Sequence, residues 1–288
     1  MPPSKENLGI FFGILAFFLF ATTDVAQKYA TIYHSVFQIM LFRYLFLLIV
    51  SFVEAKRKHN AQVWKTKNLK MQLLRSLTSV LETAFFVTSF RYLPLADVHS
   101  VAALSPIIVV ALSIIFLKEF VDRKIWFAIF FGFIGVIIIL RPGFDVFSFK
   151  SLLPLGAAFF FALYQILTKK VSETDPDETS LFFTSLFGVA TMAVLASIYW
   201  VDLMLLSYLL LPLIGVMMSL AHYCLIIGLA RAPANKIQPF HFTLIFWAII
   251  YGFIFYDDVP DMPTIIGAAI IAIAGIYIIN QQRKSLDN

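Results

Sequence analysis

Ten apolar stretches follow one another along this 288-residue chain, and each is about long enough to cross a lipid bilayer. About 20 apolar residues in a helix span the hydrocarbon core. Charged residues make up only 14% of the chain and hydrophobic residues 60%, whereas soluble domains are about 25% charged. The sequence therefore predicts an all-α polytopic membrane protein with ten transmembrane helices.

Most of the connections between these stretches are short. The net charge of +5 does not indicate nucleic-acid binding, because the basic residues lie between the apolar spans. The first span is too long for the apolar region of a typical signal peptide, so we expect it to be retained as a helix. The predicted spans are 8–26, 35–53, 73–92, 95–117, 125–140, 151–168, 181–200, 205–230, 237–256 and 264–280.

Lysine and arginine are unevenly divided between the two sides of the predicted bundle. With the N-terminus in the cytoplasm, the inner side holds 16 of the 22 basic residues and the outer side four. The remaining two, Arg43 and Arg75, fall inside spans. Cytoplasmic loops of membrane proteins carry an excess of Lys and Arg. We therefore expect both termini in the cytoplasm and the protein in the cell inner membrane.

The two halves of the chain share landmarks that keep their order. Because each half would hold five helices, an odd number, the halves must have opposite orientations, as in transporters built from inverted repeats. The predicted repeats are residues 1–143 and 144–288. Under shifts of 139 and 141 residues, the matched positions are Pro94 with Pro233, Glu119 with Asp258, Lys28 with Lys169, and Asp24 with Gln165.

Several short motifs resemble the EamA type of the drug/metabolite transporter superfamily. The resemblance covers nearly the whole chain and implies a central cavity lined by helices 1, 3, 4, 6, 8 and 9, with helices 5 and 10 at the periphery. Family members include exporters of amino acids and importers of riboflavin and S-adenosylmethionine. The motifs are residues 91–97, 105–106, 117–119, 132–136 and 141–143 in the first half, and residues 232–234, 239–240, 247–248, 258–261 and 267–277 in the second.

Three ionisable residues fall in the middle of spans, where they must face protein or water because a charge in hydrocarbon is costly. Glu82 suits a proton carrier, or else a buried structural carboxyl group. His222, in the repeat mate of that helix, suits proton transfer, or else a core histidine bonded to a carbonyl. Arg43 suits a substrate carboxylate, or else a structural ion pair with Glu82 or Asp24.

Five further residues are candidates for the transport pathway. Asp24 and Gln165 are predicted near the ends of helices 1 and 6, as residues at the mouths of the pathway or as solvated helix ends. His99 and His241 begin helices 4 and 9, with the same two interpretations. Trp247 is central in helix 9, where it would stack on an aromatic or cationic substrate or fill the core.

Smaller residues predict local geometry. Gly9 and Gly13 form a motif typical of tight helix packing. Pro106 and Pro239 each remove a backbone hydrogen bond within a span and are candidate hinges. The single cysteine, Cys224, excludes an intramolecular disulfide bond.

Motifs of other function classes are absent from the sequence. It has no Walker loop, no Gly-x-Ser-x-Gly and no His-Glu-x-x-His, and its five histidines have no recognisable metal-site spacing. We therefore expect a secondary transporter rather than an enzyme, with no cofactor and no metal. The expected partners are a small polar or zwitterionic metabolite, such as an amino-acid derivative, a vitamin or a nucleoside-like solute, together with the lipid bilayer and protons as the candidate coupling ion.

Two other functions stay open at this point: an uncoupled facilitator or exporter, and an integral-membrane enzyme that acts on a lipid. The sequence is compatible with a monomer or a homodimer.

The uneven basic charge generates a topology prediction. Reporter enzymes fused after Asn288 should show a cytoplasmic C-terminus, because 16 of the basic residues lie on that side. A green fluorescent reporter should be bright and alkaline phosphatase inactive. High phosphatase activity at this position would contradict both the orientation and the even number of helices.

Overall fold

The computed structural model describes residues 5–58, 62–116, 123–141, 148–229, 231–232 and 237–286. Ten transmembrane helices form two inverted five-helix repeats, which confirms the predicted fold class. The segments are α1 (Lys5–Tyr33), α2 (Val36–Arg57), α3 (Leu69–Tyr92), α4 (Leu95–Ala102), α5 (Ser105–Phe116), α6 (Arg123–Leu140), η1 (Phe149–Leu152), α7 (Leu153–Val171), α8 (Asp177–Ile198), α9 (Ser207–Leu229), η2 (Gln238–Phe242), α11 (Thr243–Tyr256) and α12 (Met262–Leu286).

Hydropathy alone identifies most of these helices as membrane spans. Among the described residues, seven helices are long and apolar enough to cross a membrane, and the apolar helices Lys124–Leu140 and Phe240–Tyr256 are shorter. The one transmembrane helix outside these nine is α3. It carries both Arg75 and Glu82 and is the least apolar of the helices. It packs against α7, α8 and α1, so protein rather than lipid surrounds much of it.

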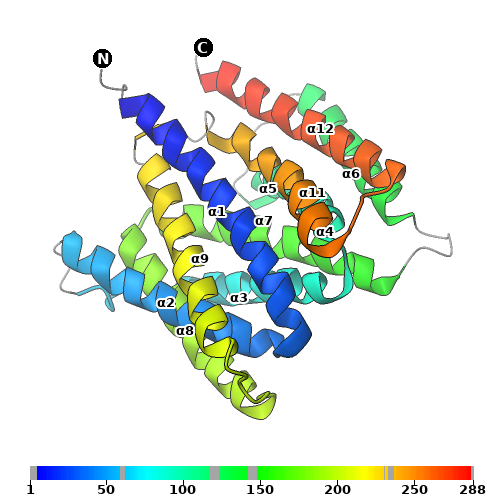
Figure 1. Cartoon of the computed structure of the whole chain (residues 1–288). Coiled ribbons are helices and arrows are strands. Elements are labelled where there is room, and N and C mark those ends of the chain that lie inside the picture. The colour runs from blue at the N-terminus through cyan, green and yellow to red at the C-terminus, as the bar shows by residue number, and fades with distance from the viewer. Residues whose placement is uncertain are drawn as a thin grey trace.

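The packing pattern repeats under the exchange of the two halves. Helix α1 packs on α9, and its repeat mate α7 packs on α3. Two pairs are made of mates themselves, α2 with α8 and α6 with α12. Figure 1 shows α6 and α12 side by side at one edge, and the first turn of α1 on the same side of the molecule as the last turns of α12. An approximate two-fold axis therefore passes through the α2–α8 and α6–α12 contacts.

The two prolines singled out in the sequence take different places in their helices. The fourth span is broken between α4 and α5, directly before Pro106, which has no N–H to donate to the preceding turn. Pro239 instead lies at the start of the ninth span, in the 3₁₀ turn η2 that leads directly into α11. The prediction that it removes a hydrogen bond within the span was therefore wrong, because an N–H in the first turn of a helix has no helical partner. The break between α4 and α5 is tolerated because Ala103 and Leu104 are buried in protein.

Several predicted helix ends were wrong, most of them because the helix is longer than its apolar stretch. Helix α1 continues to Tyr33 and α7 to Val171, beyond the predicted ends at residues 26 and 168. Asp24 therefore does not lie at a helix terminus but well inside α1, where it is 3% exposed. The extension is polar, and its side chains are satisfied within the protein: Thr31 Oγ1, for example, donates to the carbonyl of Lys28 at 2.7 Å.

Arg75, inside a span, has a structural role. Its side chain is 1% exposed and joins α3 to α7 and α8. Every N–H-bearing nitrogen of the guanidinium has an acceptor, so the buried charge is compensated. The acceptors are Gln72 Oε1, Tyr164 Oη, Thr168 Oγ1, the Ser180 carbonyl and Thr184 Oγ1.

Asp175 fastens the α2–α3 connection to the turn between α7 and α8. Its carboxylate accepts hydrogen bonds from Thr66 Oγ1, the Lys67 backbone N–H and Gln72 Nε2. Burial by itself raises the pKa of Asp175, but these hydrogen bonds outweigh it and hold the pKa below its usual value. This contribution to stability is present at neutral pH and is lost as the pH falls through the lowered pKa.

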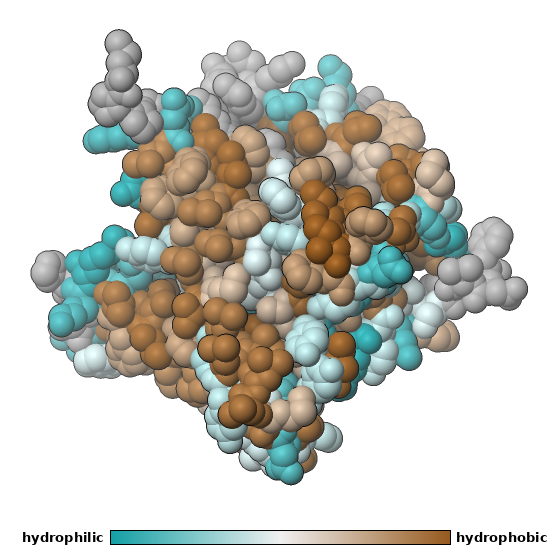
Figure 2. All heavy atoms as spheres, viewed as in Figure 1, coloured by the Kyte–Doolittle hydropathy of each residue, from teal (hydrophilic) through white to brown (hydrophobic). Residues whose placement is uncertain are grey.

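Much of the outer surface is apolar, as a bilayer requires. Large side chains such as Leu209, Phe253 and Ile273 are each more than 60% exposed. Figure 2 shows one face largely covered by apolar residues, with hydrophilic residues gathered toward its margins.

The close approach of α1 to the chain after α9 generates a stability prediction. A Cβ added at Gly9 would lie 2.7 Å from Ala232 Cβ and 2.8 Å from its backbone nitrogen. Overpacking costs about 1–3 kcal/mol, so Gly9→Ala should lower the thermal unfolding temperature in detergent. Gly252→Ala is the matched control, because its Cβ would meet nothing closer than 3.3 Å. Equal unfolding temperatures for the two variants would contradict this tight contact.

Candidate substrate-binding and coupling site

A chain of polar contacts links α2, α1 and α4 of the first repeat. Arg43 Nη1 donates to Gln27 Oε1 at 2.8 Å, and Gln27 Nε2 donates to Asp24 Oδ1 at 2.6 Å. The other Asp24 oxygen lies 3.2 Å from His99 Nε2, and both side chains are only 4% exposed. The structure thus brings three of the candidates together. An amide holds Arg43, rather than the direct ion pair with Asp24 or Glu82 that was one interpretation of the sequence.

Arg43 is only partly used by this network. Its side chain is partly exposed, and it makes no further hydrogen bond within the described part of the chain. A guanidinium carries five N–H donors, so several remain available to a ligand.

Glu82 lies on α3, close to the same network. Thr83 Oγ1 donates to Glu82 Oε2 at 2.9 Å, and the hydroxyl of Tyr44 donates to Thr83 Oγ1 at 3.3 Å. Arg43 and Asp24 are the charged groups near enough to act on the carboxyl group. The second oxygen of Glu82 has no hydrogen-bond partner among the described residues, and the side chain keeps some exposure.

His222, on α9, has one satisfied and one available nitrogen. Its Nδ1 donates to the Met218 carbonyl at 2.8 Å, which fixes Nε2 as the unprotonated nitrogen of the neutral ring. The ring packs edge-on against Phe20, with centroids 4.9 Å apart. Nε2 makes no hydrogen bond to the described residues, and the side chain is partly exposed. The carbonyl-bonded interpretation is therefore correct for Nδ1, and Nε2 stays open to a ligand or a proton.

Trp247 and His241 contribute an aromatic wall from the second repeat. Trp247 meets Phe18 of α1 edge-on at 5.0 Å between centroids and stacks on Tyr251 at 5.9 Å. His241, in η2, lies edge-on to Phe17 at 5.4 Å, and its Nδ1 is buried without a hydrogen-bond partner within the described chain. Both Trp247 and His241 are partly exposed.

Gln165 does not join either group. It lies within α7, is partly exposed, and makes no side-chain hydrogen bond to the described residues. Its repeat mate Asp24 is buried and paired with His99. The two matched positions therefore have different surroundings.

Sequence reasoning missed several residues that build the site. Gln27 bridges Arg43 to Asp24, and the hydroxyl groups of Thr22 and Tyr251 lie 2.9 Å apart across α1 and α11. Helical spacing offered a signal, since Gln27 follows Asp24 by three residues and Tyr251 follows Trp247 by four. Such pairs lie on one face of a helix.

A second cross-repeat contact lies at the far ends of α1 and α11. Lys28 Nζ donates to Asp258 Oδ2 and to the Leu93 carbonyl, each at 2.9 Å. The ammonium also lies 4.9 Å from the centre of the Tyr256 ring, and the Tyr256 hydroxyl donates to the Val25 carbonyl at 2.7 Å. These contacts join the two repeats at the end of the bundle where α1 finishes. Glu119, the repeat mate of Asp258, lies outside the described residues, as do Pro233 and Gly143.

Ten helices in two inverted repeats, with partly exposed ionisable side chains between them, define the architecture of a membrane transporter. A family model described as the EamA-like transporter family matches residues 7–141 and again 149–281. The chain belongs to the EamA-like transporter family, which confirms the resemblance seen in the sequence. Membership identifies it as a membrane transporter of small metabolites rather than an enzyme.

Curated relatives cover nearly the full length of the chain. A riboflavin transporter of Vibrio cholerae is 29% identical and spans 92% of this chain and 90% of the relative. An S-adenosylmethionine uptake transporter of Rickettsia bellii is 27% identical and spans 97% and 96%. A solved crystal structure is similar with a TM-score of 0.67, covering 96% of this chain and 98% of that chain at 16% identity, which shows likeness of fold alone.

The buried Asp24–His99 contact generates a prediction about coupling. Removing one partner of a buried pair leaves the other uncompensated, so Asp24→Asn and His99→Gln should each lower the thermal unfolding temperature. Together they should cost less than the sum of the single losses, with a coupling of about 0.5–3 kcal/mol. Unfolding of the four proteins in one detergent measures this cycle. Strictly additive losses would show that the two side chains do not interact.

Proposed function

We propose that this protein is a secondary transporter that moves a small metabolite by alternating access. Its two repeats rock around a polar centre, formed by Asp24, Arg43, Glu82, His222 and Trp247. One observation carries the proposal: Arg43, Glu82 and His222 lie inside the bundle yet keep exposed surface and unused hydrogen-bonding groups. Polar groups left unsatisfied among helices are costly, and water or a solute between the helices would satisfy them. Inverted repeats place such a site near the membrane midplane.

The substrate class follows from the two kinds of side chain around this centre. Trp247, Phe18 and Tyr251 offer ring faces and edges to a planar heteroaromatic group. The free N–H groups of Arg43 suit a carboxylate. We propose a zwitterionic solute with a heteroaromatic ring. The relatives named as transporters of S-adenosylmethionine and of riboflavin both handle ring-bearing metabolites, and only the first of these compounds is also zwitterionic.

Glu82 is the proposed coupling group. A carboxylate is costly in a closed, dry site, so protonation is favoured when water leaves and release is favoured when the site opens. Coupling follows when the substrate binds one of these two states more tightly. The alternative, an uncoupled facilitator, would make the carboxyl group structural.

The contact of Lys28 with Asp258 holds the two repeats together where α1 ends, and in this proposal it closes the pathway at that end. With the N-terminus in the cytoplasm, this end faces outward, and we propose that the pair must part before solute enters from outside. The basic residues support this orientation and a place in the cell inner membrane. A monomer or a homodimer is compatible with this mechanism.

Counterflow in proteoliposomes tests the function. Vesicles loaded with unlabelled S-adenosylmethionine should take up the labelled compound, and riboflavin serves as the uncharged ring-bearing comparison. Trp247→Ala should weaken substrate binding about 2- to 10-fold through lost stacking. Trp126→Ala, at an exposed tryptophan on α6, should leave it unchanged. Absence of counterflow with both compounds would contradict the substrate class, and equal binding by the two variants would remove Trp247 from the site.

Neutralising Glu82 tests coupling separately. Glu82→Gln keeps the shape of the protonated acid, so it should abolish accumulation driven by a pH gradient while exchange continues. Glu173→Gln, on the exposed α7–α8 turn, controls for the loss of a charge. If Glu82→Gln still accumulates substrate as the unmodified protein does, the carboxyl group is structural, and His222 becomes the next coupling candidate.

A further inference from the structure

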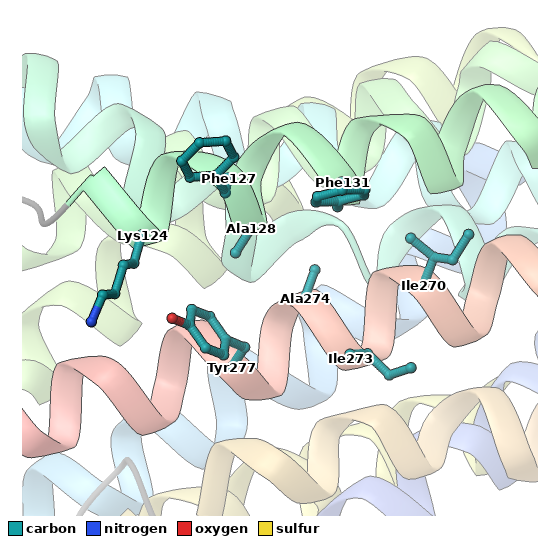
Figure 3. Close-up of a pocket in the computed structure, with 8 residues that line it drawn as sticks. All are labelled: Lys124, Phe127, Ala128, Phe131, Ile270, Ile273, Ala274 and Tyr277. Carbon is teal, nitrogen blue, oxygen red and sulfur yellow. The ribbon is translucent and has the colours of Figure 1, made fainter.

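A groove runs along the outer face of the α6–α12 pair, away from the polar centre. Its volume is about 430 Å³, which falls within the ~300–1,000 Å³ typical of ligand pockets. Figure 3 shows aromatic side chains of α6 on one side and side chains of α12 on the other. The lining residues are Lys124, Phe127, Ala128, Phe131, Ile270, Ile273, Ala274 and Tyr277.

The sequence of the two antiparallel helices explains the groove. Nearer the α6 C-terminus the backbones touch, because a Cβ at Gly267 would lie 2.5 Å from the Gly135 carbonyl oxygen. Closer to the other end, the small residues Ala128 and Ala274 form a floor between bulkier neighbours. From position 124 to position 131 the groove is about 10 Å long at 1.5 Å per residue.

The walls indicate an acyl chain as the occupant. Phe127 is 67% exposed, Phe131 52% and Ile273 69%, so the walls stand outward where the bilayer surrounds the protein. A flexible hydrocarbon chain can fill the narrow space over the two alanines. Water in the same space would hydrate apolar side chains, which is unfavourable.

One end of the groove is polar and carries a positive charge. The Lys124 ammonium and the Tyr277 hydroxyl lie toward the same end, as Figure 3 shows. Lysine and tyrosine are typical of the membrane–water interface, and a basic side chain there attracts anionic lipid. A groove that is apolar along its length and cationic at its interfacial end complements a phospholipid with a net negative headgroup.

We propose that this groove binds one acyl chain of an anionic phospholipid, with the headgroup phosphate against Lys124 and the Tyr277 hydroxyl. The floor residues Ala128 and Ala274 are buried members of the packing core of these helices, and the site needs no contact with the transported solute. A second copy of the chain is the competing occupant. In a two-fold interface the same face of each copy meets the other. This face would therefore have to carry both the groove and a ridge that fills the groove of the partner.

Lipid retention measured by native mass spectrometry tests the proposal. Protein in detergent is titrated with dioleoyl phosphatidylglycerol or dioleoyl phosphatidylcholine, with inorganic phosphate as a headgroup-only probe. One phosphatidylglycerol should be retained per chain. Lys124→Gln should weaken its binding about fivefold and leave phosphatidylcholine unaffected. Ala274→Leu, which fills the floor, should weaken both lipids, whereas Ala193→Leu, at an exposed position on α8, should change neither.

Three results would overturn the proposal. Equal retention of the two lipids by the unmodified protein would show that no charged headgroup is selected. Retention unaffected by Ala274→Leu would place the lipid elsewhere. Dimers cross-linked through a cysteine at position 131, and abolished by Ala274→Leu, would assign the groove to a second copy. Counterflow measured on the same variants separates these outcomes from the transport function, which the proposal leaves unchanged.

Discussion

The cost of placing charge in a bilayer governs this structure. An ionisable side chain at the membrane centre costs at least about 2.5–3.5 kcal/mol on insertion scales, yet Asp24, Arg43 and Glu82 all lie within spans. The structure meets this cost by connecting Arg43 to Asp24 through Gln27, by a hydrogen bond from Thr83 to Glu82, and by enclosing α3 among other helices. Arg75 shows the limiting case, since its guanidinium is fully hydrogen-bonded and buried. Arg43 and Glu82 differ because part of each remains unsatisfied, and this difference separates a structural group from a functional candidate.

The two repeats contribute different chemistry to the centre. The first supplies the acids and the arginine, whereas the second supplies His222 and the aromatic side chains of η2 and α11. A solute between them would contact both halves. Relative movement of the halves would then change its surroundings without breaking the Asp24–His99 network, which lies within one repeat. The α6–α12 pair lies apart from this centre, and tight glycine contacts hold it together.

The sequence predicted the fold well because its strongest signal, runs of apolar residues, reports directly on the membrane. It also predicted the lost hydrogen bond at Pro106, since a missing N–H is a local property, but not that Pro239 would lie at the start of its helix. Helix ends were less predictable: polar residues after position 26 read as a loop, but α1 continues because their side chains bond within the protein. The partners of Asp24 depend on three helices meeting in space, and no local pattern encodes that. Roles in binding and coupling stay predictions.

Alternating access around the polar centre is the central claim, and cysteine accessibility tests it most directly. Cys224 is the one cysteine and is 4% exposed, so Cys224→Ser provides a background in which Thr22→Cys introduces a single thiol beside Tyr251. A membrane-impermeant maleimide is applied to right-side-out and to inside-out vesicles. The account predicts labelling from both sides, in a ratio that substrate changes. Labelling from one side only, whatever the substrate or pH, would contradict it.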